Sequence, residues 1–313
     1  MTVNHYDLLV LGAGPAGLTA ALYGHRAGLR VLALGGNTPG GQVTLHDKVE
    51  NFPGFPGGVT GAELMARWLK QVIDETGSMP SPESVTRVDL GGEIKEVFTS
   101  EAHHRARTVV IATGSSPKAL GIPGESELRG KGVFYCATCD APLLRTMQRR
   151  RAAVIGGGDT AAHTALALLP HAESVTVITR GADLGAGQAL RKRLQDNPAV
   201  TILLGRVVRE VVGSERAEGL LIEKIPTRER ETCPVEAVFV GIGGSPVTGF
   251  LQEALALDER GFIVTDSLLR TSVPGVFAAG DVRTTPLRQI VTAAADGALA
   301  AHMAHKYLRH GDH

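Results

Sequence analysis

The sequence predicts a two-domain α/β protein with two dinucleotide-binding units, and three observations predict it. An apolar strand pattern passes directly into a glycine turn and then into an alanine-rich helix pattern at residues 6–27. The same order returns at residues 151–169. A glycine turn between a strand and a helix is typical of Rossmann-like folds. The chain has 313 residues, enough for two domains that each bury a core.

The first unit opens with the apolar segment 6–11, which predicts a strand, and the segment 29–34 predicts the strand that closes a βαβ unit. Between them, Gly12 and Gly14 let the backbone approach a pyrophosphate, and Gly17 lets the helix pack closely on the strand. The helix N-terminus offers N–H groups to an anion. These features favour dinucleotide binding over a plain strand-to-helix turn.

Ribose recognition in the first unit must differ from the usual pattern. Rossmann-like folds commonly place an acidic residue roughly 20 positions after the glycine turn, where its carboxylate binds the ribose. No acidic residue lies between Asp7 and Asp47 in this chain.

The second unit repeats the pattern with a strand at residues 151–155, a turn at Gly156-Gly157-Gly158 and a helix that Pro170 ends. Further strand-and-turn patterns precede it at residues 109–114 and follow it at residues 276–281. We therefore expect a first domain that is interrupted by a second. The expected boundaries are 1–116 and 244–313 for the first domain, and 117–243 for the inserted one.

Composition excludes several classes of protein. Hydrophobic residues make up 43% of the chain and charged residues 20%, as in folded globular proteins. The 32 basic residues balance 32 acidic ones, so no global field favours nucleic acid or an anionic membrane. No apolar run approaches the roughly 18 residues that span a bilayer, and no signal-peptide pattern opens the chain. A cytoplasmic location is expected.

The pair Cys136 and Cys139 has three interpretations, namely half a zinc site, a structural disulfide or a redox couple. Zinc requires further ligands, and only Cys233 remains as a thiol, so no metal site is predicted. A disulfide that closes so short a loop removes little chain entropy. Redox exchange is favoured, in which one thiol attacks and its neighbour resolves the mixed disulfide. We expect Cys233 to be a buried or half-buried bystander.

The segment from Tyr135 to Asp140 resembles the active-site segment of low-molecular-weight, bacterial-type thioredoxin reductases. The resemblance covers nearly the whole chain. It extends through Gly12-Ala13-Gly14-Pro15-Ala16-Gly17, Gly40-Gly41-Gln42, Glu50-Asn51-Phe52-Pro53-Gly54, Ala112-Thr113-Gly114, Gly156-Gly157-Gly158-Asp159, Gly275-Val276-Phe277-Ala278-Ala279-Gly280-Asp281 and Arg288-Gln289.

The resemblance implies that both ends of the chain build an FAD-binding domain and that the protein is a homodimer. It implies that Asp281 binds a flavin-side hydroxyl and that the helix after Arg288 points its positive end at the ring. The residues it implies for FAD are Gly12, Gly14, Pro15, Ala16, Gly17, Gly41, Gln42, Asn51, Ala112, Thr113, Gly114, Gly280, Asp281, Arg288 and Gln289. Those for a second nucleotide are Gly156, Gly158, Asp159, Thr160 and Arg180.

The resemblance also assigns the catalytic roles. Cys139 exchanges electrons with the flavin, Cys136 attacks the disulfide of thioredoxin or a thioredoxin-like protein, and Asp140 donates or accepts the proton. The predicted function is therefore FAD-dependent thioredoxin-disulfide reduction.

The chain departs from the family where NADPH binds. The family holds the 2′-phosphate with His-Arg-Arg-x-x-x-Arg, whereas residues 179–185 keep only Arg180 and carry Gly181 and Gly185 in place of the other arginines. At roughly 1.5–3 kcal/mol for each charge-assisted bond, this loss weakens NADPH specificity. NADH does not inherit the site cleanly either, because Asp183 lies beyond the usual ribose-binding position. The choice between NADPH and NADH stays open.

Two alternatives follow. In the first, the same disulfide chemistry is driven by another electron donor, such as reduced ferredoxin, a flavin or a deazaflavin. A candidate surface for an acidic donor protein is formed by Arg145 and the run Arg149–Arg151. The other alternative is a redox sensor in which flavin and thiols report oxidation to a bound partner.

Overall fold

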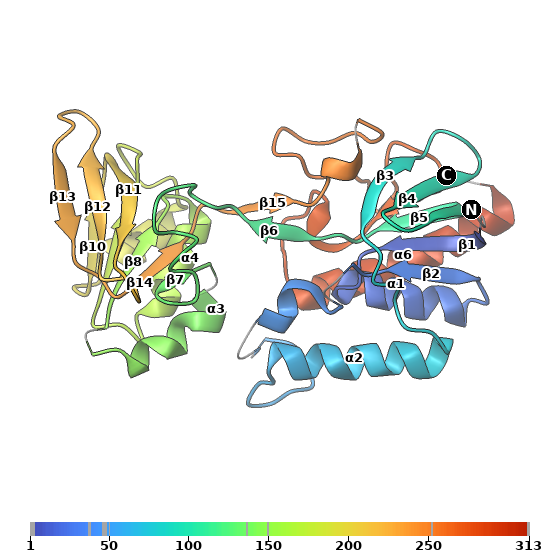
Figure 1. Ribbon diagram of the computed structural model, residues 1–313, viewed down its shortest axis with the longest axis horizontal. Helices are drawn as coiled ribbons and strands as arrows, with labels where there is room; N and C mark the ends of the chain where they lie inside the picture. The colour runs from blue at the N-terminus through green and yellow to red at the C-terminus, as the bar shows by residue number, and fades with distance from the viewer. Residues whose placement is uncertain are drawn as a thin grey trace. The chain divides into compact units, whose positions relative to one another are not determined.

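The computed structural model describes residues 4–36, 39–45, 49, 51–135, 137–148, 150–251 and 253–311. The chain divides into two compact units (Figure 1). The split unit joins Met1–Ser116 to Ser245–His313, and the inserted unit comprises Pro117–Gly244. Each unit is an α/β structure around a sheet with parallel strands, so the predicted fold class is confirmed.

The split unit contains strands from both ends of the chain. They are β1 (Asn4–Leu11), β2 (Val31–Leu34), β3 (Val85–Asp89), β4 (Lys95–Thr99), β5 (His103–Ile111) and β16 (Val276–Ala278). Its helices are α1 (Pro15–Arg26), α2 (Gly61–Thr76) and α6 (Ile290–His310), with short 3₁₀ segments η1 (Gly41–Leu45), η3 (Gly249–Leu251) and η4 (Gly280–Val282).

The sheet of the split unit runs in the order β2-β1-β5-β4-β3, and β16 also pairs with β5. β1 is parallel to β2 and β5, whereas β3 and β4 form an antiparallel extension. Leu8 to Leu11 are fully buried because both faces of the sheet are covered. Leu8 and Val10 belong to the core that contains α1, α2 and α6, and Leu9 and Leu11 face the core on the opposite side.

Helices α1 and α6 pack against each other through small residues. Ala16 and Ala20 on α1 are buried, as are Ala300, Ala301 and Gly297 on α6. A side chain at Gly297 would overlap the carbonyl oxygen of Ala16, so the two backbones approach more closely than any larger residue allows. This contact fixes α6 next to the glycine turn that begins α1.

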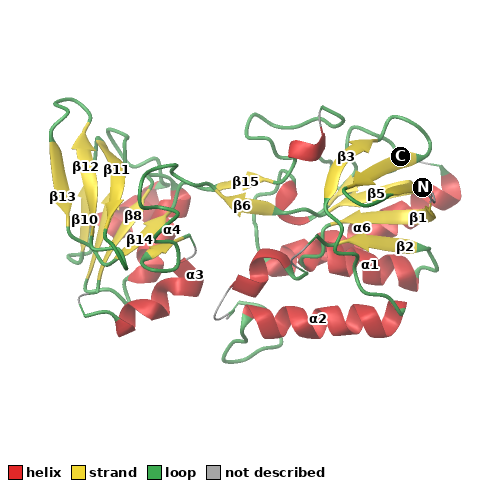
Figure 2. Cartoon of the chain, in the orientation of Figure 1, coloured by secondary structure: helices red, strands yellow, loops and turns green. Residues whose placement is uncertain are grey.

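The inserted unit carries the remaining elements (Figure 2). Its strands are β7 (Val133–Phe134), β8 (Arg151–Ile155), β9 (Ser174–Ile178), β10 (Val200–Leu203), β11 (Arg206–Val212), β12 (Gly219–Lys224), β13 (Arg230–Cys233) and β14 (Ala237–Val240). Its helices are α3 (Ala137–Asp140), α4 (Asp159–Leu168) and α5 (Gln188–Gln195), with a 3₁₀ segment η2 (Ala141–Thr146).

The parallel sheet of the inserted unit has the order β10-β9-β8-β14-β7. Val154 and Val177 pack in a core with the helices, and Ala153 and Ile178 pack in a second core with β11-β12-β13, an antiparallel sheet. The parallel sheet is therefore covered on both faces, and the inserted unit buries hydrophobic residues of its own.

The chain passes between the units through two short strands, β6 (Ser115–Pro117) and β15 (Gly244–Pro246). These strands pair with each other, and the N–H of Lys118 donates to the carbonyl of Gly243 at 3.0 Å. None of the helices in the described part of the chain is long and apolar enough to cross a membrane.

Candidate functional site

The first glycine turn lies between the end of β1 and the start of α1. Gly12 has φ +114°, and a side chain there would overlap the carbonyl of Ala112; one at Gly17 would overlap the carbonyl of Gly12. Apart from Gly14 and its neighbours along the chain, no atom of the described residues lies within 4 Å of the position that a Cβ of Gly14 would take, and no described side chain caps α1. Because Pro15 has no N–H, the free donors of the first turn belong to the residues after it. The turn is therefore tight on its inner side and open where an anion would bind.

Two further predicted segments meet this turn at the carboxyl ends of the strands. Gly41 has φ +60°, and its Cβ position lies 3.4 Å from the Cα of Gly14. Ala112 donates its N–H to the carbonyl of Leu11 at 2.7 Å, and the hydroxyl of Thr113 donates to the carbonyl of Val247 at 2.7 Å. Gly114 follows with φ +71°, and Gln42 is exposed beside Gly41. Crevices at the carboxyl ends of parallel strands are where α/β folds bind ligands.

Asp281 follows β16 in the 3₁₀ segment η4. Burial is the main cause that raises the pKa of its carboxyl to about 6, and the neighbouring Asp296 adds to the rise while Arg288 opposes it. No hydrogen bond from another described residue reaches this carboxylate. Asp296, in contrast, accepts hydrogen bonds from the N–H of Gly280 at 3.0 Å and from the guanidinium of Arg283. The Asp281 carboxylate is thus free to accept a hydroxyl from a ligand.

The N-terminus of α6 brings distant residues together. Gln289 caps the helix in a reciprocal arrangement with Thr292, and its Oε1 accepts a hydrogen bond from Nδ2 of Asn51 at 2.8 Å. The guanidinium carbon of Arg288 lies 4.0 Å from the ring centroid of Phe262, and burial lowers the pKa of Arg288. Sequence patterns alone did not identify Phe262, Arg283 or Asp296, because no short motif surrounds them.

These residues fit a flavin dinucleotide. The open position at Gly14 and the uncapped N-terminus of α1 suit a pyrophosphate, and the unpartnered, half-buried Asp281 suits a hydroxyl of a polyol chain. Both lie in the split unit, close to the contact between Gly280 and Ala16, whose Cβ lies 3.0 Å from the Cβ position of Gly280.

The predicted redox segment follows β7 in the inserted unit. Cys136 lies outside the described residues, and the backbone of Cys139 belongs to α3, although its side chain is not described. Asp140 ends α3 and is half-buried. The geometry of the sulfur atoms therefore stays a prediction from the sequence.

The second glycine turn joins β8 to α4. Gly156 has φ +145°, and a side chain there would overlap the carbonyl of Gly241. Nothing lies within 4 Å of the Cβ position of Gly158, so this turn is also open at the helix N-terminus. Asp159 begins α4, and its Oδ1 accepts the N–H of Gly187 at 2.8 Å, while Thr160 is exposed.

The loop after β9 is folded tightly on itself. Arg180 is exposed, and the Cβ position of Gly181 lies only 2.8 Å from the carbonyl oxygen of Asp183. The carboxylate of Asp183 pairs with Arg191 at 2.7 Å. Gly185 has more space, since the nearest atom to its Cβ position is the carbonyl oxygen of Gly157 at 3.7 Å. Of the three arginines in the family pattern, this loop offers one.

The arginines proposed as a surface for an acidic donor protein are only partly available in the structure. Arg150 pairs with Glu173 and Arg151 with Glu236, so these two arginines do not form a free basic surface, and Arg149 lies outside the described residues. Arg145 is exposed in η2.

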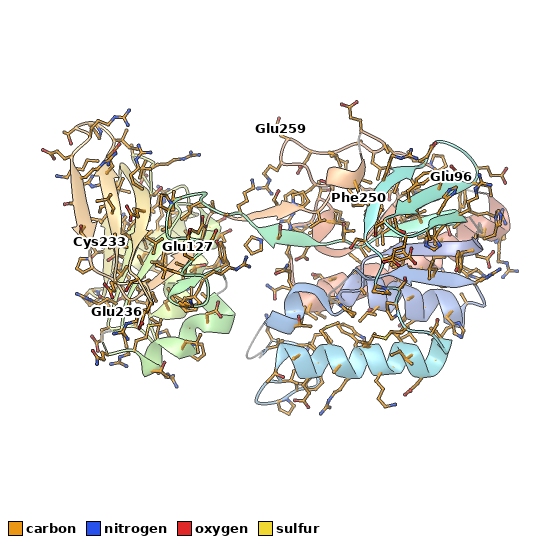
Figure 3. All side chains as sticks on the ribbon, viewed as in Figure 1. Glu96, Glu127, Cys233, Glu236, Phe250 and Glu259 are labelled. Atoms are coloured by element: carbon orange, nitrogen blue, oxygen red, sulfur yellow. The ribbon has the colours of Figure 1, made fainter. Side chains whose placement is uncertain are left out.

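Cys233, at the end of β13 (Figure 3), is a half-buried free thiol, and burial raises its pKa. The predicted burial of Cys233 is thus confirmed, and its role as a bystander stays a prediction. Among the described residues, no group of three His, Cys, Asp or Glu side chains is arranged to hold a metal ion.

Comparison with known proteins identifies the family. The chain matches the model of the pyridine nucleotide-disulphide oxidoreductases over residues 6–297. It is 41% identical to the thioredoxin reductase of Peptoclostridium litorale over 311 residues, which cover 97% of this chain and 98% of the relative. The chain belongs to the thioredoxin reductase family. Membership confirms the prediction that the protein is an oxidoreductase enzyme of this class.

Solved structures of thioredoxin reductases are similar to this chain over nearly its whole length. The thioredoxin reductase of Streptococcus pyogenes superposes with a TM-score of 0.78 at 38% identity, over 97% of this chain and 98% of that chain. A ferredoxin-flavin thioredoxin reductase from Clostridium acetobutylicum superposes with a TM-score of 0.54 at 28% identity, over 98% of this chain and 99% of that chain. The name of this second structure includes ferredoxin as well as flavin.

Proposed function

We propose that this protein is an FAD-dependent thioredoxin-disulfide reductase that acts on thioredoxin or a thioredoxin-like protein. The observation that carries the proposal is the retained pair Cys136 and Cys139 in a chain that is similar to thioredoxin reductases over nearly its whole length. The proposal assigns FAD to the split unit and a second nucleotide site to the inserted unit. It includes a homodimer in the cytoplasm, where thiols are kept reduced.

In the split unit, we assign the pyrophosphate to the N–H groups at the start of α1 and a flavin-side hydroxyl to the carboxylate of Asp281. Bound FAD supplies two-electron transfer to a disulfide. Asn51 and Gln289, which bind each other across 238 positions of the chain, hold the start of α6 where the ring is expected. Five of the other predicted residues are glycines, and we assign to them the close backbone approach: Gly12, Gly17, Gly41, Gly114 and Gly280.

The thiol chemistry is assigned to the inserted unit. With both cysteines reduced, the thiolate of Cys136 attacks one sulfur of the substrate disulfide, a mixed disulfide forms, and the other substrate sulfur leaves. The sulfur of Cys139 then attacks that of Cys136, which closes the Cys136–Cys139 disulfide and releases the second substrate thiol. Asp140, half-buried directly after Cys139, is the assigned proton donor for a leaving thiolate.

The nucleotide loop of the inserted unit supports a weakened preference for NADPH. Gly181 and Gly185 provide no guanidinium, and the carboxylate of Asp183 in the same loop pairs with Arg191. Of the three arginines in the family pattern, a 2′-phosphate would therefore meet Arg180 alone, whereas strong phosphate sites use several forked, charge-assisted bonds. We infer that the loss of two such bonds removes most of the discrimination between NADPH and NADH.

Anaerobic mixing tests this proposal. The FAD-loaded protein is mixed separately with NADPH and with NADH while the loss of oxidised flavin absorbance is followed. We expect the two nucleotides to reduce the flavin with rate constants and affinities within about tenfold of each other, since one tenfold step is about 1.4 kcal/mol. Tight, fast and exclusive reduction by NADPH would contradict the inferred weakening.

A second candidate function has a different donor. The nucleotide loop that lacks two arginines, together with the similarity to a structure named ferredoxin-flavin thioredoxin reductase, favours it. The same experiment separates the two candidates. If neither nucleotide bleaches the flavin and dithionite does so readily, a protein or free flavin donor is indicated, and reduced ferredoxin is the first to test.

A further inference from the structure

Glu125 is a buried carboxylate in the inserted unit, with an exposed fraction of 2%. Its Oε1 accepts hydrogen bonds from the N–H of Leu120 at 2.8 Å and from the hydroxyl of Tyr135 at 2.8 Å. Its Oε2 accepts the N–H of Gly121 at 2.7 Å. A carboxylate leaves water at a large cost in free energy unless hydrogen bonds replace its solvation. Here three donors do so, which explains how Glu125 is buried.

The three donors come from two segments with different roles. Leu120 and Gly121 lie just after β6, in the chain that enters the inserted unit. Tyr135 follows β7 and directly precedes Cys136. One carboxylate therefore joins the entering segment to the residue before the first redox cysteine.

The backbone around Glu125 leaves little freedom for this arrangement to change. Gly124 has φ +80°, and a side chain there would overlap the carbonyl of Val211 on β11. The N–H of Val211 donates to the carbonyl of Pro123 at 2.9 Å. The segment that carries Glu125 is thus held against the antiparallel sheet of the inserted unit.

Tyr135 is fixed by more than its hydroxyl. The guanidinium carbon of Arg129 lies 5.0 Å from the centroid of the tyrosine ring, a distance at which a cation is attracted to an aromatic face. Burial, followed by the hydrogen bond to Glu125, raises the pKa of the hydroxyl to about 12. Tyr135 therefore stays protonated at neutral pH and donates its hydrogen bond to Glu125.

From these contacts we propose that Glu125 and Tyr135 are positioning residues for the redox pair, which hold the backbone directly before Cys136 in one arrangement. The proposal rests on the proposed function of Cys136 and Cys139. Thiol reactivity depends on the electrostatic surroundings of the sulfur, and a displacement of about 1 Å lowers catalytic rates strongly. Loss of the Tyr135 hydroxyl removes this constraint on the residue before Cys136. Because Cys136 is the proposed attacking thiolate, we expect its reactivity to fall.

The test measures thiol reactivity in the variants Tyr135→Phe and Glu125→Gln. The FAD-loaded protein is reduced with dithiothreitol, the reductant is removed anaerobically, and alkylation of Cys136 by iodoacetamide is followed by mass spectrometry from pH 5 to 9. We expect the rate constant at pH 7 to fall at least threefold in both variants and the midpoint of the pH profile to move upward. The double variant is expected to show less than the sum of the two single changes, because both substitutions act on the same hydrogen-bond network.

A matched control separates positioning from stability. Glu236 (Figure 3) is a half-buried carboxylate of the same unit that accepts hydrogen bonds from Arg151, so Glu236→Gln weakens a network whose hydrogen bonds involve neither Glu125 nor Tyr135. We expect this variant to lose stability without a change in the alkylation profile. An unchanged profile in a folded Tyr135→Phe protein would overturn the inference. A wild-type Cys136 that alkylates no faster than Cys233 would instead refute the proposed function, and the inference with it.

Discussion

The proposed weakening of NADPH preference leads to a prediction about the nucleotide loop after β9. Gly181 and Gly185 stand where the family pattern has arginine, but the structure makes them unequal. The Cβ position of Gly181 lies 2.8 Å from the carbonyl oxygen of Asp183, closer than real Cβ contacts, whereas that of Gly185 has nothing nearer than 3.7 Å. We therefore expect Gly185→Arg to tighten NADPH binding and Gly181→Arg to distort the loop.

The magnitude follows from the bond that a new arginine would form. One charge-assisted hydrogen bond to a phosphate contributes roughly 1.5–3 kcal/mol, and an exposed, flexible side chain belongs at the lower end of that range. Since about 1.4 kcal/mol is tenfold in an equilibrium constant, Gly185→Arg should lower the Kd of NADPH about tenfold. The Kd of NADH, which has no 2′-phosphate, should change by less than about twofold.

Isothermal titration of the FAD-loaded protein with each nucleotide measures both constants, and Gly185→Gln controls for side-chain length without charge. Equal tightening of NADPH and NADH would mean that the arginine acts as a general positive charge. A larger gain from Gly181→Arg than from Gly185→Arg would show that the Asp183 carbonyl does not restrict the loop. Either result would refute the reasoning.

Three further predictions concern stability and reactivity. Because the folded state raises the pKa of Asp281 to about 6, above its unfolded value, the flavin-free protein binds more protons when folded and should lose stability as the pH rises from about 4 to 6. Asp281→Asn should abolish this pH dependence, stabilise the flavin-free protein at pH 7 by on the order of 2 kcal/mol and weaken FAD binding. Urea unfolding measures the stability, and flavin titration measures the binding of FAD. A pH dependence of stability that is unchanged in the variant would contradict the raised pKa of Asp281. Gly297→Ala should destabilise the protein by roughly 1–3 kcal/mol, because its methyl group overlaps the carbonyl of Ala16; a neutral effect on urea unfolding would show that the α1–α6 contact relaxes freely. Cys233→Ser should leave thioredoxin reduction unchanged, since burial raises the pKa of that thiol and keeps it a poor nucleophile; a loss of turnover greater than about twofold would give Cys233 a role that its position does not suggest.

Most of the fold could be predicted from local sequence patterns. Each glycine turn, with the apolar run before it and the alanine-rich helix after it, is a contiguous segment whose conformation depends on short-range sterics, as the left-handed φ of Gly12 and Gly156 illustrates. The pattern also indicated that the second unit interrupts the first, because strand-and-turn signals appear on both sides of it. The same local information exposed the missing arginines at residues 181 and 185.

What the motifs did not contain are the contacts between segments far apart in the chain. The bond between Asn51 and Gln289 and the stacking of Arg288 on Phe262 depend on how β1, β16 and α6 assemble, and no pattern around any one of these residues specifies the other. The sequence analysis did not identify Glu125, because its burial depends on hydrogen bonds from Gly121 and Tyr135 that no single motif contains.

The sequence by itself therefore determined the class of protein, the nucleotide turns and the cysteine pair, since these depend on residues that are neighbours along the chain. The tertiary structure alone decided which groups are changed by burial. The raised pKa of Asp281, the protonated Tyr135 and the closed space at Gly181 all arise from atoms brought close by folding. Solvent exclusion and steric contact act over a few ångströms in space, whatever the distance along the chain.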